Sequence, residues 1–230
     1  MNEDRNVDFT PLPGRCSALK PQKRKPNRLS LFVDDQFVCG AIAKAFEVCG
    51  ITVDSRVDET LIRQLLELDE RFRFQDQCYR WLGRRAYSRG ELVQKGVQKG
   101  YPEKIITSVL DEFQENGWID DRNFACDYAD IHFRRKQWGP GKIRAGLAQK
   151  GVAKTDIDFA LKQLEDFDEQ LFIMKNVVGK NRRRLLREPD LQKRKHKLID
   201  LLRRKGYHPE VIFRNIEHLI QHLTDETTNT

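Results

Sequence analysis

The stretch KGYPEKIITSVL at residues 99–110 decides the fold, because its pattern recurs as KGVAKTDIDFAL at 150–161 and as KGYHPEVIFRNI at 205–216. Each copy has a Lys-Gly pair, an isoleucine six residues after the glycine and an aliphatic residue ten after it. Another apolar residue follows at position thirteen, and an aliphatic residue precedes each glycine by eight. Offsets of six, ten and thirteen share one face of an α-helix. Each copy is therefore predicted to be a helix, a glycine stop and a second helix.

The spacing of the copies indicates the domain organisation. The three glycines lie 51 and 55 residues apart, which leaves room for one further helix ahead of each Lys-Gly pair. Stacked neighbours in such an array bury apolar surface that a single unit leaves exposed. The sequence therefore predicts a mainly α fold, a curved and elongated body built from three-helix repeats at residues 75–117, 118–166 and 167–224.

The residues ahead of the first repeat follow other patterns. Residues 1–27 combine four prolines and several basic residues with few apolar ones, which predicts a disordered tail. Residues 28–74 predict a hairpin-plus-helix module, with a turn at Asp34-Asp35 between two alternating apolar stretches. Helices are expected at 41–49 and 58–74. Residues 225–230 are expected to form a second disordered tail.

Local signals place the helix starts within the repeats. The first helix of the first repeat is expected at 76–86. Ser88 and Glu91 have the spacing of a capping box, in which each residue satisfies a backbone N–H of the other. Asp120-Asp121 is expected to cap the first helix of the second repeat, and Gly139-Pro140 to start its middle helix.

The positive charge is concentrated in one segment. The chain has a formal net charge of +7, whereas residues 178–205 contain twelve Lys/Arg against three acidic residues, a local balance of +9. Stripes of this kind suit a phosphate backbone, because neutralising it releases condensed counterions. The candidate DNA- or filament-binding residues are Arg84, Arg85, Arg134, Arg135, Lys136, Lys180, Arg182, Arg183, Arg184, Arg187, Lys193, Arg194, Lys195, Lys197, Arg203 and Arg204.

Signals for enzymatic chemistry are weak. The five cysteines are scattered and form no CxxC pair, and the five histidines lie near no convergent Cys/Asp/Glu set. We therefore expect no catalytic residue, no cofactor and no metal. The sequence contains no apolar run of the roughly 20 residues that span a membrane, and no signal-peptide core. These features favour a monomeric cytoplasmic protein that acts by binding.

Two other interpretations remain open. One is a DNA-binding repressor that uses a helix-turn-helix, which two helices of each unit superficially resemble. That interpretation requires polar side chains that reach base edges, and the expected third helices carry dissimilar polar faces. The other is a nuclease with a carboxylate site around Asp120-Asp121. Oligonucleotide retardation and a Mg²⁺-dependent cleavage assay would separate these options.

Several motifs resemble those of the RecX family, regulators of the RecA recombinase. They are Ser88-x-x-Glu91-Leu92, Lys99-Gly100-Tyr101, GWIDDRNFA at 117–125, the stretch from Gly139-Pro140 to Lys150-Gly151, and RRKGY at 203–207. The resemblance covers residues from about 75 to 222 and implies tandem three-helix units without a catalytic residue. It implies that the partner is the RecA–DNA filament, whose growth or stability the protein limits. Strand exchange and coprotease activity would be restrained, and with them homologous recombination, DNA repair and the SOS response.

The first repeat departs from the family pattern at Gly96. An aliphatic residue is expected there, and the internal repeat has Leu147 and Leu202 at the matching positions. Gly90 lies just inside the same helix. Each glycine destabilises a helix interior by roughly 0.5–1 kcal/mol relative to alanine. The middle helix of the first repeat is therefore expected to be marginally stable by itself.

Overall fold

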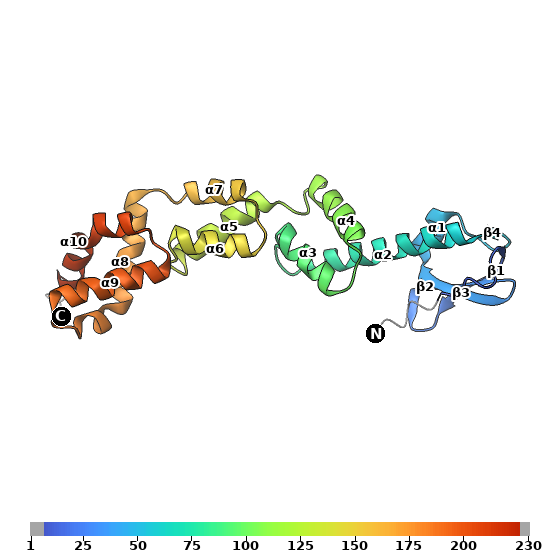
Figure 1. Cartoon of the computed structure of the whole chain (residues 1–230), viewed down its shortest axis with the longest axis horizontal. Coiled ribbons are helices and arrows are strands. Elements are labelled where there is room, and N and C mark those ends of the chain that lie inside the picture. The colour runs from blue at the N-terminus through green and yellow to red at the C-terminus, as the bar shows by residue number, and fades with distance from the viewer. Residues whose placement is uncertain (1–6, 226–230) are drawn as a thin grey trace. The chain divides into compact units, whose positions relative to one another are not determined.

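The chain folds into two compact units (Figure 1). The computed structural model describes residues 7–225. The first unit contains the chain up to Arg85 together with Val93–Asn116, and the second contains Ala86–Leu92 and the chain from Gly117 onwards. Within the described range, no helix is long and apolar enough to cross a lipid bilayer.

The N-terminal part of the first unit is an antiparallel sheet. Its strands are β1 (Gly14–Gln22), β2 (Lys25–Val33), β3 (Gln36–Ile42) and the short β4 (Arg56–Val57), in the order β3-β2-β1-β4. The hairpin predicted at Asp34-Asp35 is confirmed, since β2 and β3 pair across these residues.

The disordered tail predicted for residues 1–27 is wrong over the part that the structure describes. β1 pairs with β2 through Cys16 with Val33 and Leu19 with Leu31, and Cys16 is fully buried in the core. Pro21 is tolerated in β1 because β4 pairs with only the first two residues of this strand. Pro21 therefore needs no N–H for a neighbour on that side. Residues 1–6, and residues 226–230 of the predicted C-terminal tail, lie outside the described range.

One long helix replaces two predicted ones. Helix α1 (Ala43–Cys49) ends at Gly50 as expected, and Asp58 caps α2 by accepting from the N–H of Leu61 at 2.9 Å. However, α2 runs without a break over Glu59–Leu82, so the separate helices predicted at 58–74 and 76–86 are a single helix. The physical reason is that this stretch contains no glycine or proline to end it.

The remaining helices form the tandem three-helix units, which confirms the predicted fold class. In the first unit the end of α2 packs against α4, and in the second α5, α6 and α7 pack together, as do α8, α9 and α10. Their bounds are α3 (Arg89–Gln98), α4 (Glu103–Glu115), α5 (Asp121–Arg134), α6 (Pro140–Gln149), α7 (Lys154–Lys162), α8 (Phe167–Leu186), α9 (Leu191–Lys205) and α10 (Pro209–Asp225). The curvature of the array stays a prediction.

The repeat register matches the burial. Ile106, Ile157 and Ile212, six residues after each glycine, are buried. The residues eight before each glycine, namely Leu92, Ile143 and Leu198, are also buried. The glycines themselves adopt left-handed φ angles of 77°, 74° and 91°, which a side chain disfavours. The Lys-Gly pair thus ends one helix and turns the chain into the next.

Gly96 has a packing explanation. A Cβ atom at this position would lie 2.8 Å from Cδ1 of Ile106 and 3.0 Å from Cε2 of Phe74. The ring of Phe74 in turn lies 4.9 Å from that of Tyr101. Ile106 and the ring of Phe74 thus fill the space beside Gly96, and a larger residue at this position would collide with them.

Successive repeats join through the ends of their middle helices. At the first junction the hydroxyl of Ser88, at the start of α3, donates to the carbonyl of Lys150 at the end of α6 at 2.6 Å. At the second, the N–H of Gly139 donates to the carbonyl of Lys205 at 2.7 Å and the N–H of Gly141 to that of Gly206 at 2.9 Å. The positive end of one helix dipole therefore meets the negative end of the next.

Glycine permits this close approach. A Cβ atom on Gly90 would lie 2.4 Å from the carbonyl oxygen of Lys150 and 2.7 Å from Cα of Gly151. A Cβ atom on Gly139 would likewise lie 2.5 Å from the carbonyl carbon and oxygen of Gly206. The first turn of α3 packs on these second-unit residues, which is why Ala86–Leu92 belongs to the second unit.

Two helical glycines allow a matched test of this junction. Gly90→Ala should lower the free energy of unfolding by roughly 1–3 kcal/mol, because the backbones must separate. Gly179→Ala is the control, since nothing lies within 4 Å of a Cβ built there. The control should instead stabilise the protein by about 0.5–1 kcal/mol through helix propensity. Chemical denaturation measures the free energy of unfolding of both variants. An equal increase in this free energy for both would contradict the proposed close contact.

Candidate nucleic-acid interface

The exposed face of α8 collects four basic side chains. Lys180, Arg183, Arg184 and Arg187 follow one another at intervals that place them on one side of the helix, and all four are exposed. Across residues 7–225 none of the four forms an ion pair with a carboxylate. Arg182, predicted with them, is half-buried on another side of the helix. Only part of the basic cluster predicted from the sequence therefore forms an exposed, positively charged surface.

The basic residues of α9 divide into two groups. Arg194 donates to the carbonyl of Glu188 at 3.0 and 2.7 Å, and so secures the turn between α8 and α9. Lys195 pairs with Glu217 at 2.6 Å, and Lys197 pairs with Glu188, also at 2.6 Å. The exposed residues Lys193, Arg203 and Arg204 make no ion pair in the described part of the chain.

The smaller basic groups differ in their surroundings. Arg134 pairs with Asp130 and with Glu169, the latter at 2.8 Å. Arg135 and Lys136 follow it at the end of α5 and are exposed. Arg84 and Arg85 belong to the first unit, whereas all the other candidates belong to the second. The structure therefore brings the C-terminal candidates into one unit.

The junction between the second and third repeats contains a lysine cluster that the sequence analysis missed. At the first junction Lys150 pairs with Glu91 at 2.6 Å. In the repeat register Lys205 corresponds to Lys150 and Lys142 to Glu91, so that like charges replace an ion pair. Burial lowers the pKa of Lys205, and the charges of Lys142 and Lys180 lower it further.

The lysine cluster, defined as Lys142, Lys180 and Lys205, extends the basic face of α8 to the repeat junction. The ammonium of Lys205 donates to the carbonyl of Lys136 at 3.1 Å, so its position is fixed. Positive charges held together without a carboxylate favour a bound anion. One sequence signal could have identified this cluster: the second repeat has Lys142 at the position where the first repeat has Glu91.

The aspartates considered for a nuclease have structural partners. Asp120 caps α5 by accepting from the N–H of Asn123 at 2.9 Å. Asp121 accepts from the N–H of Arg89 at 2.8 Å, and burial raises its pKa. Among residues 7–225 no group of three or more His, Cys, Asp or Glu side chains could hold a metal ion. Asp120 therefore caps the start of α5, and Asp121 binds a backbone N–H at the start of α3.

The fold and its motifs match one family of known proteins. Sequence models of the first and second RecX three-helix domains match residues 76–113 and 120–161. A regulatory protein RecX from Clostridium perfringens (strain SM101 / Type A) is 27% identical over 194 residues, which are 84% of this chain and 91% of that protein. The chain belongs to the RecX family. The RecX family is a family of regulatory proteins.

Further relatives agree with this assignment. A regulatory protein RecX from Geobacillus sp. (strain WCH70) is 33% identical over 159 residues, 69% of this chain and 58% of that protein. A crystal structure of a regulatory protein RecX is similar with a TM-score of 0.72 and 25% identity, covering 86% of this chain and 96% of the other. RecX from Lactobacillus salivarius shares the fold, with a TM-score of 0.60 and 20% identity over 68% of this chain and 97% of the other.

The lysine cluster can be tested in this RecX family protein through its stability. Lys142→Glu should recreate the ion pair of the first junction and remove a like-charge contact. We expect a gain of about 0.2–1 kcal/mol in the free energy of unfolding, which should shrink at high salt because the charges are screened. Lys142→Gln, which removes only the repulsion, should give a smaller gain. A loss of stability in both variants would refute the unfavourable lysine contact.

Proposed function

We propose that the protein is a negative regulator of the RecA recombinase, which binds the RecA–DNA filament in the cytoplasm and limits its growth or stability. Membership of the RecX family supports this function, since its members are named regulatory proteins. Restrained strand exchange and coprotease activity would follow, because both require the assembled filament. The protein would act by binding, without a catalytic residue, cofactor or metal.

The observation that carries the proposal is the basic face of α8 with the adjoining lysine cluster. Lys180, Arg183, Arg184 and Arg187 present their charges to solvent without carboxylate partners in the described chain. Guanidinium groups match the geometry of phosphate oxygens, and lysines supply further point charges. We infer that this surface contacts the DNA backbone of the filament. Contacts of this kind carry no sequence information.

The salt dependence of DNA binding tests the basic face directly. Arg183→Gln combined with Arg184→Gln should reduce the slope of log K against log salt by roughly 1.4–1.8, because about 0.7–0.9 of a counterion is released per phosphate contact. Fluorescence anisotropy with single- and double-stranded oligonucleotides over a salt series measures this slope. Both residues are exposed, so the fold should be unaffected.

A matched variant controls for the loss of net charge. Lys154 and Lys162, on α7, are also exposed, and replacing both with glutamine removes the same charge elsewhere in the second unit. For this double variant, the slope of log K against log salt should remain close to that of the unchanged protein. If both double variants give equal slopes, general charge rather than the α8 face determines binding.

The dose required for inhibition tests the action on RecA. The protein should slow ATP hydrolysis by RecA on single-stranded DNA at substoichiometric amounts, since an agent bound to a filament affects many subunits. A protein that only coats DNA must approach saturation of the lattice. The assay should use moderate salt, at which weak electrostatic coating fades. Inhibition that appears only when all the DNA is covered would favour a sequence-nonspecific DNA-binding protein that does not act through RecA.

A further inference from the structure

A cavity in the second unit adjoins the basic face of α8. It has a volume of about 540 Å³, in the range of small-ligand sites. Phe172, Asn176 and Lys180 line it at intervals of four residues, which places them on one side of α8 with Arg184. None of its lining residues within the described chain is acidic. The cavity therefore continues the basic face towards the start of α8.

The positive charge of this cavity is not compensated inside the described protein. Lys180 is exposed, and Lys175, which also lines the cavity, is half-buried. Within residues 7–225 neither ammonium forms an ion pair with a carboxylate. Their charges are therefore available to an external anion.

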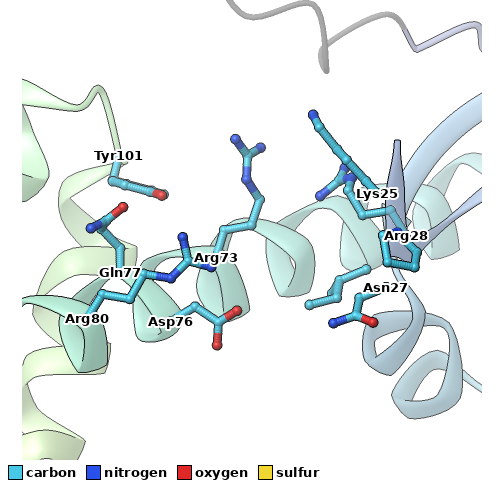
Figure 2. Close-up of a pocket in the computed structure, with 10 residues that line it drawn as sticks. Lys25, Asn27, Arg28, Arg73, Asp76, Gln77, Arg80 and Tyr101 are labelled. Carbon is cyan, nitrogen blue, oxygen red and sulfur yellow. The ribbon is translucent and has the colours of Figure 1, made fainter. Parts of the chain in front are cut away.

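A basic cavity in the first unit differs in this respect. Figure 2 shows Arg73 rising from α2 between Tyr101 on one side and Lys25 and Arg28 on the other. Arg28 donates to Asp69 at 2.9 Å, and the guanidinium of Arg73 lies 3.8 Å from the same carboxylate. Because the two arginines share one buried aspartate, this cavity offers less free charge to a ligand than its number of cations indicates.

An exposed aromatic ring lies beside the lysines of the second-unit cavity. Phe172 is 62% exposed although it lines the cavity. Gly179 lines it as well, and nothing lies within 4 Å of a Cβ atom built there. The space at this position is therefore not filled by a side chain. Aromatic rings beside cations form platforms on which the bases of single strands stack.

A buried amide also lines the cavity. Gln137 lies in the turn between α5 and α6, is 7% exposed and has a φ of 56°, a left-handed value that strains a residue other than glycine. The N–H of Trp138 donates to the carbonyl of His132 at 3.0 Å, which fixes this turn. Within residues 7–225 the side-chain amides of Gln137 and Asn176 make no hydrogen bond. Both can therefore bind the donors and acceptors at the edge of a base.

These groups favour an unstacked base as the ligand. Phosphate contacts along α8 need no access to the bases. In a duplex the ring faces are stacked and the base edges are paired, so a base enters a side cavity only at the cost of unstacking and unpairing. The bases of a single strand can turn out without this cost. An acidic peptide would use the lysines but would leave the ring and the amides without a role.

We propose that this cavity holds one unstacked base of single-stranded DNA whose phosphates lie on the basic face of α8. The base stacks on Phe172 and meets the amides of Gln137 and Asn176, while Lys175 and Lys180 bind the adjoining phosphates. The site depends on the proposed DNA contact of α8 and gives that contact a preference for single strands.

The dependence of affinity on the bases tests the cavity. Fluorescence anisotropy compares the full chain on oligothymidylate and on an abasic strand of equal length, which has the same phosphates. The unchanged protein should bind oligothymidylate about 5- to 10-fold more tightly, as one base–aromatic stack predicts. Phe172→Ala should bring the two affinities within about twofold and leave the salt slope unchanged, because it removes a stack but no charge. Gly179→Leu, which narrows the cavity and keeps the ring and the lysines, should lower the preference in the same way.

A matched variant and the α8 variants complete the test. Phe213→Ala removes a ring that is 59% exposed on α10 and does not line the cavity, so the preference for oligothymidylate should remain. Equal preferences in Phe172→Ala and Phe213→Ala, or equal affinity of the unchanged protein for both strands, would overturn the site. If Arg183→Gln with Arg184→Gln leaves the salt slope unchanged, the DNA contact of α8 itself fails. If that slope falls while Phe172→Ala keeps the preference, only the base cavity is refuted.

Discussion

The docking of one middle helix on the end of the next is the constraint on which the second unit depends. The start of α3 meets the end of α6, and the start of α6 meets the end of α9, each through hydrogen bonds to the carbonyls of a Lys-Gly turn. These carbonyls and N–H groups have no partner within their own helices. Their mutual satisfaction joins the repeats, and the second and third repeats also share one buried apolar cluster. Glycine at Gly90 and Gly139 is required because a side chain would separate the backbones.

The same backbone geometry supports two different charge arrangements. At the first junction, Lys150 and Glu91 form an ion pair that closes the site. At the second, Lys142 replaces the glutamate and leaves Lys205 among positive charges. A purely structural joint would gain from a carboxylate at this position. The absence of one, next to the basic face of α8, is consistent with a surface that uses its charge on an external anion.

The sequence located the basic segment but could not separate its roles. Helical periodicity places Lys180, Arg183, Arg184 and Arg187 on one face, and this could have been read from their spacing. By contrast, Arg194 binds a backbone carbonyl and Lys195 pairs with Glu217 on another helix. Such partners depend on how α8, α9 and α10 pack. A count of the basic residues in the sequence therefore overestimates how many of them are available to bind a partner.

The sequence by itself determined the helical repeats, the glycine stops, the helix caps and the hairpin at Asp34-Asp35. Each of these features depends on residues that lie only a few positions apart. Only the tertiary structure decided that residues 14–22 form a strand and that Gly96 makes room for Phe74. It also decided that Arg28 is held by Asp69, 41 residues away. A strand with prolines is stable only once a partner strand and a core cover it. Long-range contacts of this kind leave no periodic trace in the sequence.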